Sequence, residues 1–167
     1  MPRPSANGSN RMGDIDSFFE RASKRWDEGE LKSAFHLFLA GAKSGDSGSQ
    51  LNLGTFYCDG IGVKPNRDRA LYWYRRAYKL GQRCAANNIA VLFSTEGKSS
   101  LALSWFGRAA ELGDGDANVE MAKLYLLRKD RAKAIQCLRR AVRGIAGDDI
   151  SGAGREEAVE LLKKVGK

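Results

Sequence analysis

Four side chains in this sequence could support nucleophilic or metal chemistry, namely the single histidine, His36, and the cysteines Cys58, Cys84 and Cys137. A histidine acts as a general base only when a nucleophile lies within hydrogen-bond reach. The spacing of the cysteines matches no zinc pattern, and an odd number of widely spaced cysteines suits a reducing compartment better than a disulfide framework. These residues predict neither a catalytic site nor a metal site, and we expect the protein not to be an enzyme.

Two glycine-rich stretches invite comparison with phosphate-binding loops. Gly60 and Gly62 lack the third glycine of the dinucleotide fingerprint, and the run from Gly144 to Gly154 lacks the lysine of a P-loop. Neither stretch follows a predicted β-strand, which both motifs require. We expect both to be loops, and we expect no cofactor and no small-molecule substrate.

Length and composition favour one helical domain. Of the 167 residues 43% are apolar and only three are proline, which is ordinary for a folded helical chain. Residues Met1 to Gly13 contain no signal-peptide core, and no later run of ~18 apolar residues could span a membrane. We expect a flexible segment over residues 1–13, a single repeat domain over residues 14–167, and a soluble cytoplasmic protein without membrane insertion.

An internal repeat organises the chain. Four alanines recur at spacings of 36, 32 and 32 residues, and each is followed by a large apolar residue four positions later and a small residue seven positions later. Positions i, i+4 and i+7 share one helix face, and small residues let a neighbouring helix approach closely. The pattern predicts the second helix of four helix pairs. The alanines are Ala34, Ala70, Ala102 and Ala134.

The first helix of each pair has a small residue of its own. It stands twelve residues before the alanine of the second helix at Ala22, Ala90 and Ala122, and sixteen residues before it at Gly54. A fifth small residue, Ala158, has no second helix after it. We therefore expect residues 156–165 to form a helix that caps the stack.

The repeat register also predicts which chemically active side chains are accessible. His36 stands at the outward position of its helix, and Cys137 takes the inward position that Trp73 and Trp105 occupy in other units. We expect the histidine to be solvated and Cys137 to be buried.

The segment Leu51 to Gly81 carries the fullest pattern, Leu-Gly-x-x-Tyr-x-x-Gly-x-Gly-Val from Leu53, then Asp-x-Ala-x-x-Trp-Tyr-x-x-Ala from Asp68. This pattern resembles the Sel1-like repeat, a relative of the tetratricopeptide repeat, and the shorter units resemble plain tetratricopeptide repeats. The resemblance implies an all-α fold. It would be a right-handed α–α superhelix of about four helix-turn-helix repeats with a C-terminal capping helix.

The resemblance further implies a non-enzymatic protein–protein interaction module that acts as an adaptor, scaffold or regulator. Small repeat proteins of this kind also occur as bacterial immunity proteins that neutralise a cognate toxin or effector, which is our finer hypothesis. Projected onto tetratricopeptide geometry, the first helices line a concave groove. For Phe19 and Trp26, packing beneath the N-terminal segment is the open alternative. The groove positions are Phe19, Ser23, Trp26, Leu51, Thr55, Asn87, Val91, Asp116, Val119, Lys123 and Arg155.

The formal net charge of +8 would attract acidic proteins, nucleic acids or anionic membranes. Its basic residues fall on predicted second helices and their loops, the convex side of this architecture. Nucleic-acid binding would predict aromatic side chains exposed beside the arginines for stacking, whereas the aromatic residues fall mainly on the packing register. We favour a protein partner with an acidic surface, with nucleic-acid binding by the basic convex face as the alternative. The basic residues are Arg75, Arg76, Lys79, Arg128, Lys129, Arg131, Lys133, Arg139, Arg140 and Arg143.

Overall fold

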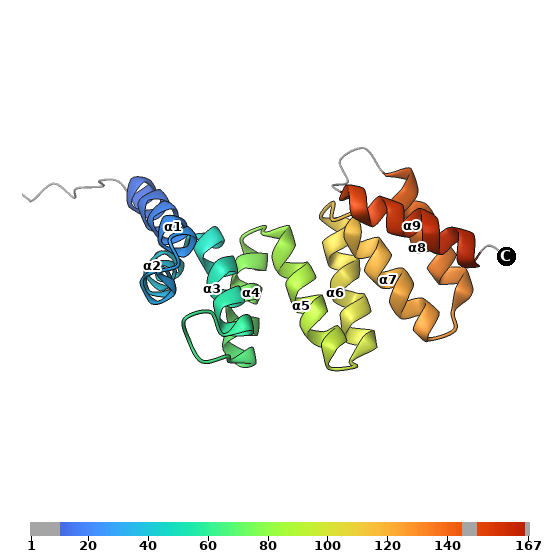
Figure 1. The fold of residues 1–167 in the computed structure, drawn as a ribbon, viewed down its shortest axis with the longest axis horizontal. Coiled ribbons are helices and arrows are strands. Elements are labelled where there is room, and N and C mark those ends of the chain that lie inside the picture. The colour runs from blue at the N-terminus through green and yellow to red at the C-terminus, as the bar shows by residue number, and fades with distance from the viewer. Residues whose placement is uncertain (1–10, 145–149, 166–167) are drawn as a thin grey trace, which may run out of the picture. The chain divides into compact units, whose positions relative to one another are not determined.

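The structure of the chain, a computed structural model, describes residues 11–144 and 150–165. Within these ranges the chain forms nine α-helices and no β-strand (Figure 1). The helices are α1 (Arg11–Asp27), α2 (Leu31–Ser44), α3 (Ser47–Asp59), α4 (Arg67–Lys79), α5 (Arg83–Thr95), α6 (Ser99–Glu111), α7 (Asp116–Leu127), α8 (Arg131–Arg143) and α9 (Gly152–Val165). No helix among them is long and apolar enough to cross a membrane.

The helices belong to two compact units, Met1–Ala77 and Tyr78–Lys167, with the boundary inside α4. In the N-terminal unit, α1 packs on α2 and α2 on α3, and α3 contacts α4 through the hydroxyls of Thr55 and Tyr74, 3.2 Å apart. In the C-terminal unit, α5 packs on α6, α6 on α7 and α7 on α8, and α9 contacts both α7 and α8. The predicted start of the repeat domain at residue 14 stays a prediction, and residues 1–10 lie outside the described residues.

The small residues of the repeat lie where helices meet. All four second-helix alanines are fully buried, and so are the first-helix alanines Ala22, Ala90, Ala122 and Ala158. Gly54 shows why a small residue is needed, because a Cβ there would lie 2.5 Å from the ring of Tyr74. The all-α repeat fold predicted from the sequence is confirmed.

The loop between α3 and α4 depends on glycine. Gly60 and Gly62 have φ angles of 73° and 64°, in the left-handed region that glycine adopts most readily. At Gly62 a Cβ would also lie 2.8 Å from the backbone of Leu31, so the loop lies directly on the start of α2. The helix that follows is capped by Asn66, whose side-chain oxygen accepts a hydrogen bond from the backbone N–H of Arg69 at 2.9 Å.

The capping helix is longer than predicted. It begins at Gly152, so the expectation that Gly152 and Gly154 belong to a loop is wrong, while residues 145–149 of that stretch lie outside the described residues. The cause is a cap that the repeat pattern does not contain: the Ser151 hydroxyl accepts a hydrogen bond from the backbone N–H of Gly154 at 2.9 Å.

The core differs between the units. In the N-terminal unit it is built from aromatic rings, with Phe56 lying 5.0 Å from Trp26 and 5.4 Å from Phe38 between ring centroids. In the C-terminal unit Phe93 and Phe106 are also buried, but the cluster around Leu138 consists of small and aliphatic side chains of α7, α8 and α9 together with Cys137. The predicted burial of Cys137 is confirmed.

Candidate functional site

The histidine and the three cysteines lie on four different helices, α2, α3, α5 and α8. His36 is exposed on α2, as predicted, and its ring lies edge to face with that of Phe35, 5.5 Å away between centroids. Among the described residues, no group of three His, Cys, Asp or Glu side chains is placed to hold a metal ion. The three cysteines are all free, with Cys84 exposed and Cys58 half-buried.

The thiol of Cys58 is held in its neutral form. Burial raises its pKa to about 11, and the neighbouring carboxylate of Asp59 adds to the shift by hydrogen bonding and by charge, while the hydroxyl of Tyr74 opposes it. Burial also raises the pKa of the Cys137 thiol. Since the thiolate is the reactive form of cysteine, neither residue has the environment of a nucleophile.

Alkylation should therefore distinguish the cysteines. We expect iodoacetamide at pH 8 to modify Cys84 first, because it is exposed. A shift of the Cys58 pKa from 9.0 to about 11 leaves roughly a hundredfold less thiolate. A more basic thiolate is also a stronger nucleophile, and this offsets about half of the hundredfold loss on a logarithmic scale. Cys58 should therefore react roughly tenfold more slowly than a thiol with an unshifted pKa. Peptide mass spectrometry over time measures the rates, and equal rates at Cys58 and Cys84 would contradict the prediction.

The predicted groove residues of α1 and α3 are all partly exposed. Phe19 and Trp26 pack on α2, with ring centroids 6.0 and 6.1 Å from that of Phe38, which shows how both are held. Leu51 and Thr55 lie one turn apart on α3 and are half-buried. These side chains and that of Ser23 are each partly buried and partly exposed to solvent.

In the C-terminal unit, α5 carries an apolar and an amide position of the predicted groove. Val91 is 44% exposed, and Asn87, one turn earlier, is half-buried. Neither belongs to the buried residues of α5, which include Ile89 and Phe93. These side chains are available to a partner.

On α7 the predicted groove is closed by α9. Val119 is only 2% exposed and belongs to the core, so its prediction as a partner-binding residue is wrong. The carboxylate of Asp116 accepts hydrogen bonds from the backbone N–H and the hydroxyl of Ser151, at 3.2 and 3.0 Å. The sequence indicates that residues 156–165 form a cap, but not which side chains of α7 the cap covers.

Lys123 links the same two helices. Its ammonium lies 2.6 Å from a carboxylate oxygen of Glu120 and 3.1 Å from one of Glu157 on α9. Burial alone would lower the pKa of this lysine, but the hydrogen bonds and charges of the two glutamates outweigh it and raise the pKa. Lys123 therefore stays protonated in a structural ion-pair network, whereas Arg155 is exposed on α9.

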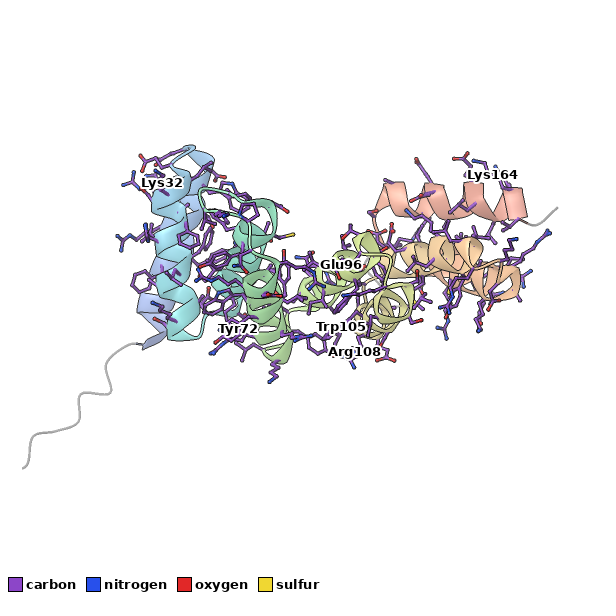
Figure 2. All side chains as sticks on the ribbon, turned by 90° about the horizontal axis from the view of Figure 1, so that it is seen from below. Lys32, Tyr72, Glu96, Trp105, Arg108 and Lys164 are labelled. Carbon is purple, nitrogen blue, oxygen red and sulfur yellow. The ribbon has the colours of Figure 1, made fainter. Side chains whose placement is uncertain are left out.

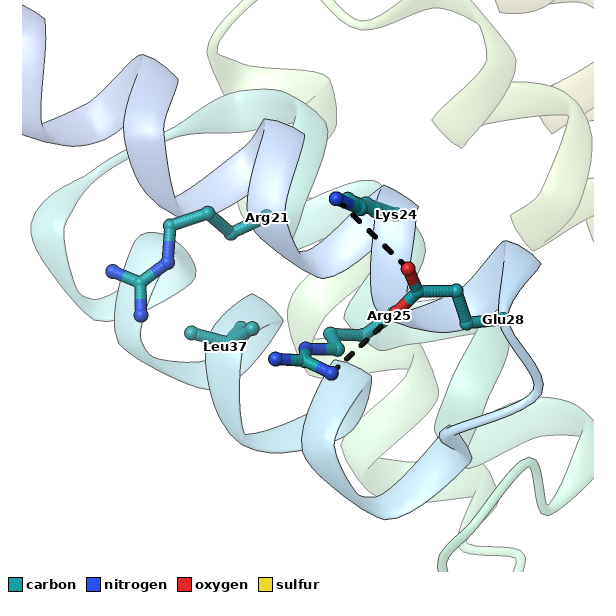
Figure 3. Close-up of a pocket in the computed structure, with 5 residues that line it drawn as sticks. All are labelled: Arg21, Lys24, Arg25, Glu28 and Leu37. Atoms are coloured by element: carbon teal, nitrogen blue, oxygen red, sulfur yellow. Dashed lines mark hydrogen bonds and ion pairs between the residues drawn. The ribbon is translucent and has the colours of Figure 1, made fainter.

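A hollow of about 220 Å³ between α1 and α2 has no counterpart among the sequence predictions (Figure 3). Arg21, Lys24, Arg25 and Glu28 line it at positions i, i+3, i+4 and i+7 of α1, and Leu37 of α2 forms its apolar part. Glu28 lies 4.0 Å from Lys24 and 3.4 Å from Arg25, so its charge is shared. The lining of the hollow is therefore mostly charged, with both signs present.

The basic second-helix residues named above are all exposed. Two accessible aromatic rings also lie beside arginines, which is relevant to nucleic-acid binding because bases stack on such rings. Tyr72 is 52% exposed and accepts a hydrogen bond from Arg76 at 3.1 Å. The guanidinium of Arg108 lies over the ring of Trp105, 4.3 Å from its centroid, and Figure 2 shows these two side chains together. Arginine thus already contacts the aromatic rings that are accessible beside it.

Solved structures share this fold. A Sel1 repeat protein from Oxalobacter formigenes superposes with a TM-score of 0.68 at 23% identity, over 98% of this chain and 75% of that one. The protein c5321, a protective antigen of uropathogenic Escherichia coli strains with an SLR fold, gives 0.74 at 22% identity, over 92% and 35%. YrrB, a TPR protein with an unusual peptide-binding site, gives 0.62 at 20% identity, over 89% and 74%.

A sequence relative is the sel1-like repeat-containing protein L21 of Acanthamoeba polyphaga mimivirus. It is 31% identical over 85 residues, which is 51% of this chain and 16% of that protein. The present chain therefore spans about a sixth of the length of this relative.

The model of the Sel1 repeat matches residues 47–82, 85–114 and 116–144, together more than half of the chain. Each matched segment coincides with one helix pair, α3–α4, α5–α6 or α7–α8. Because the family pattern and the observed helix pairs agree in these three consecutive repeats, the chain belongs to the Sel1 repeat family.

Proposed function

We propose that this chain binds another protein through its first helices and acts as an adaptor, scaffold or regulator. Sel1 and tetratricopeptide repeats generally mediate protein–protein interaction, and proteins built from them are typically non-catalytic. The observation that carries the proposal is the partial exposure of first-helix side chains, Trp26 and Leu51 in the N-terminal unit and Val91 in the C-terminal unit.

These side chains have the chemistry of a binding surface. Aromatic and aliphatic anchors that pack on one side and stay open on the other contribute most to the affinity of interfaces, and hydroxyl and amide groups beside them fix the orientation. Thr55 and Asn87 supply such groups on α3 and α5. The likeness in fold to YrrB, a TPR protein with an unusual peptide-binding site, is in keeping with this proposal.

The finer form of the proposal is that the chain neutralises a cognate toxin or effector inside a bacterial cytoplasm. The net charge of +8 suits a partner with an acidic surface. Co-expression with the products of neighbouring genes tests this form, since a toxic product should cease to inhibit growth when the chain is present. If no neighbouring product is toxic, or if toxicity persists, the neutralising role is wrong and the general binding role is unaffected.

A matched pair of variants tests the first-helix surface. We expect Val91→Glu to reduce co-purification of the partner at about 150 mM salt by tenfold or more, since a buried charge at an interface costs several kcal/mol. Leu101→Glu is the control, because Leu101 is 47% exposed, close to the 44% of Val91, but stands on α6, the second helix of the same pair. Equal capture by both variants, quantified by mass spectrometry with isotope labels, would contradict the proposed surface.

Nucleic-acid binding by the basic second-helix face is the other candidate function. The exposed arginines favour it, and so does the partly accessible Trp105 beside Arg108. Binding of this kind weakens steeply as salt rises, because counterions are released from the phosphates. Undetectable binding of DNA and RNA between about 50 and 150 mM salt would exclude it.

A further inference from the structure

Most of the net charge of the chain is concentrated in the hairpin that joins α7 to α8 and in α8 itself. Residues 128–143 hold seven lysines and arginines and one acidic residue, Asp130, so this segment alone carries +6 of the net +8. The adjacent helix α9 has three basic and three acidic residues. A solvated face normally mixes both signs, so the segment differs from its surroundings.

The outer face of α8 is also concave. A hollow of about 350 Å³ runs along it, opposite the buried face of the helix. The lining residues lie at i, i+3, i+4, i+7, i+8 and i+11, which is one continuous stripe of about 17 Å. Its first half is apolar or neutral and its second half consists of guanidinium groups. This α8 stripe comprises Ala132, Ile135, Gln136, Arg139, Arg140 and Arg143.

Structural roles account for only part of this charge. Lys133 pairs with Asp130 at 3.1 Å and lies over the ring of Tyr125. Arg140 and Arg143 stand in the last turn of α8, where cations stabilise the helix dipole. Arg139 lies before that turn and is exposed. Within the described part of the chain, no carboxylate neutralises the stripe.

We infer that the α8 stripe is a second docking surface, which binds an acidic amphipathic segment of a partner protein. Ile135 and Ala132 offer an apolar floor for one or two apolar side chains. The guanidinium groups that follow can hold carboxylates through paired hydrogen bonds, the geometry in which arginine binds them best. A stripe of this length matches about three turns of a bound helix.

The composition of the surface favours a protein over a nucleic acid. Residues 128–143 contain no aromatic side chain on which bases could stack. An apolar half-stripe contributes nothing to phosphate binding, whereas it matches the apolar face of an amphipathic helix. The stripe stands on a second helix, so this inference is independent of the first-helix surface proposed above.

A synthetic peptide provides the test. The probe is a fluorescein-labelled helical 18-mer with leucine on one face and glutamate on the other, and its reference is the same peptide with glutamine in place of glutamate. Fluorescence anisotropy with the full chain at about 150 mM salt gives the dissociation constants. We expect saturable binding of the glutamate peptide, and at least tenfold weaker binding of the glutamine peptide.

Two charge-reversal variants locate the binding. Arg139→Glu with Arg143→Glu should weaken it about 10–30-fold. Lys32→Glu with Lys43→Glu changes the net charge equally at exposed positions of α2 and should weaken it less than twofold. Leu101→Glu adds a negative charge at an exposed position of α6, outside the stripe, and should bind the peptide like the unaltered chain. Circular dichroism checks that each variant folds, and Arg139→Gln with Arg143→Gln replaces the reversal variant if that one does not.

Three results would overturn the inference. The first is no saturable binding of the glutamate peptide by the unaltered chain. The second is an equal loss in both double variants, which would mean attraction to net charge rather than to the stripe. The third is tighter, stripe-dependent binding of a 20-base-pair DNA duplex in the same assay, which would assign the surface to nucleic acid.

Discussion

Replacing Phe56 by alanine is expected to lower the free energy of unfolding by about 3–5 kcal/mol, the largest effect of any substitution proposed for this chain. Phe56 is fully buried at the centre of the aromatic core of the N-terminal unit. Its ring centroid lies 5.0 Å from that of Trp26, 5.4 Å from Phe38 and 6.4 Å from Phe35. Truncation removes the apolar burial and leaves a cavity that three rings on two other helices cannot readily fill.

Urea unfolding followed by tryptophan fluorescence measures this loss, since Trp26 contacts the deleted ring directly. Leu127→Ala is the control. Its side chain is 80% exposed at the end of α7, so the same kind of truncation should change the free energy by less than about 0.5 kcal/mol. A loss below about 1 kcal/mol for Phe56→Ala would mean that the aromatic core is not packed as described.

The helix pairs could be predicted because their contacts obey a local rule. A helix that approaches another closely needs a small side chain at the crossing, and the register of Ala34 fixes the next contact position at Gly41. Both are buried. The outward position of His36 and the inward position of Cys137 follow from the same register, and the structure confirms both.

The end of the stack could not be predicted in the same way. The start of α9 is linked to α7 by the hydrogen bonds between Asp116 and Ser151, which are 35 residues apart, and Ser151 belongs to no repeat position. Neither the earlier start of the helix at Gly152 nor the burial of Val119 beneath it has a signal in the periodicity. Long-range polar contacts of this kind do not recur from repeat to repeat, so the repeat pattern cannot predict them.

Phe19 and Trp26 illustrate a different limit. Their side chains serve the core and the surface at once, because each ring contacts Phe38 and still remains partly exposed. An aromatic residue at a first-helix position is compatible with either role, so spacing alone leaves the choice open. How much of such a ring is buried depends on how the neighbouring helix packs against it.

First and second helices present different chemistry. The first helices expose aliphatic, aromatic, hydroxyl and amide groups, such as Val91 and Thr55, whereas the outer face of α8 exposes guanidinium groups beside Ile135. A repeat pair has two accessible sides, since its core occupies only one stripe of each helix. The two proposed surfaces can thus be altered one at a time, and the variants described above do so.

The second large effect is expected at the capping helix. Gly154→Val should lower the free energy of unfolding by about 3 kcal/mol, because a Cβ at this position would overlap the carboxylate of Asp116 and lie 3.0 Å from the hydroxyl of Ser151. Relieving that overlap requires the carboxylate to leave the hydrogen bonds that fix the start of α9. Hydrogen exchange should then show faster exchange of the α9 amides, while α5 and α6 keep their protection.

Ala153→Val is the matched control, since Ala153 is exposed and adjacent, and valine there costs only its lower helix propensity, about 0.5 kcal/mol. A capping helix that separates uncovers Val119 and Ala122, which α9 shields from water. Gly154→Val should therefore also aggregate at concentrations at which Ala153→Val shows no aggregation in light scattering. Unchanged α9 exchange in Gly154→Val would show that the cap is held by its apolar face alone, through Ala158 and Leu161, and not by the contact between Asp116 and Ser151.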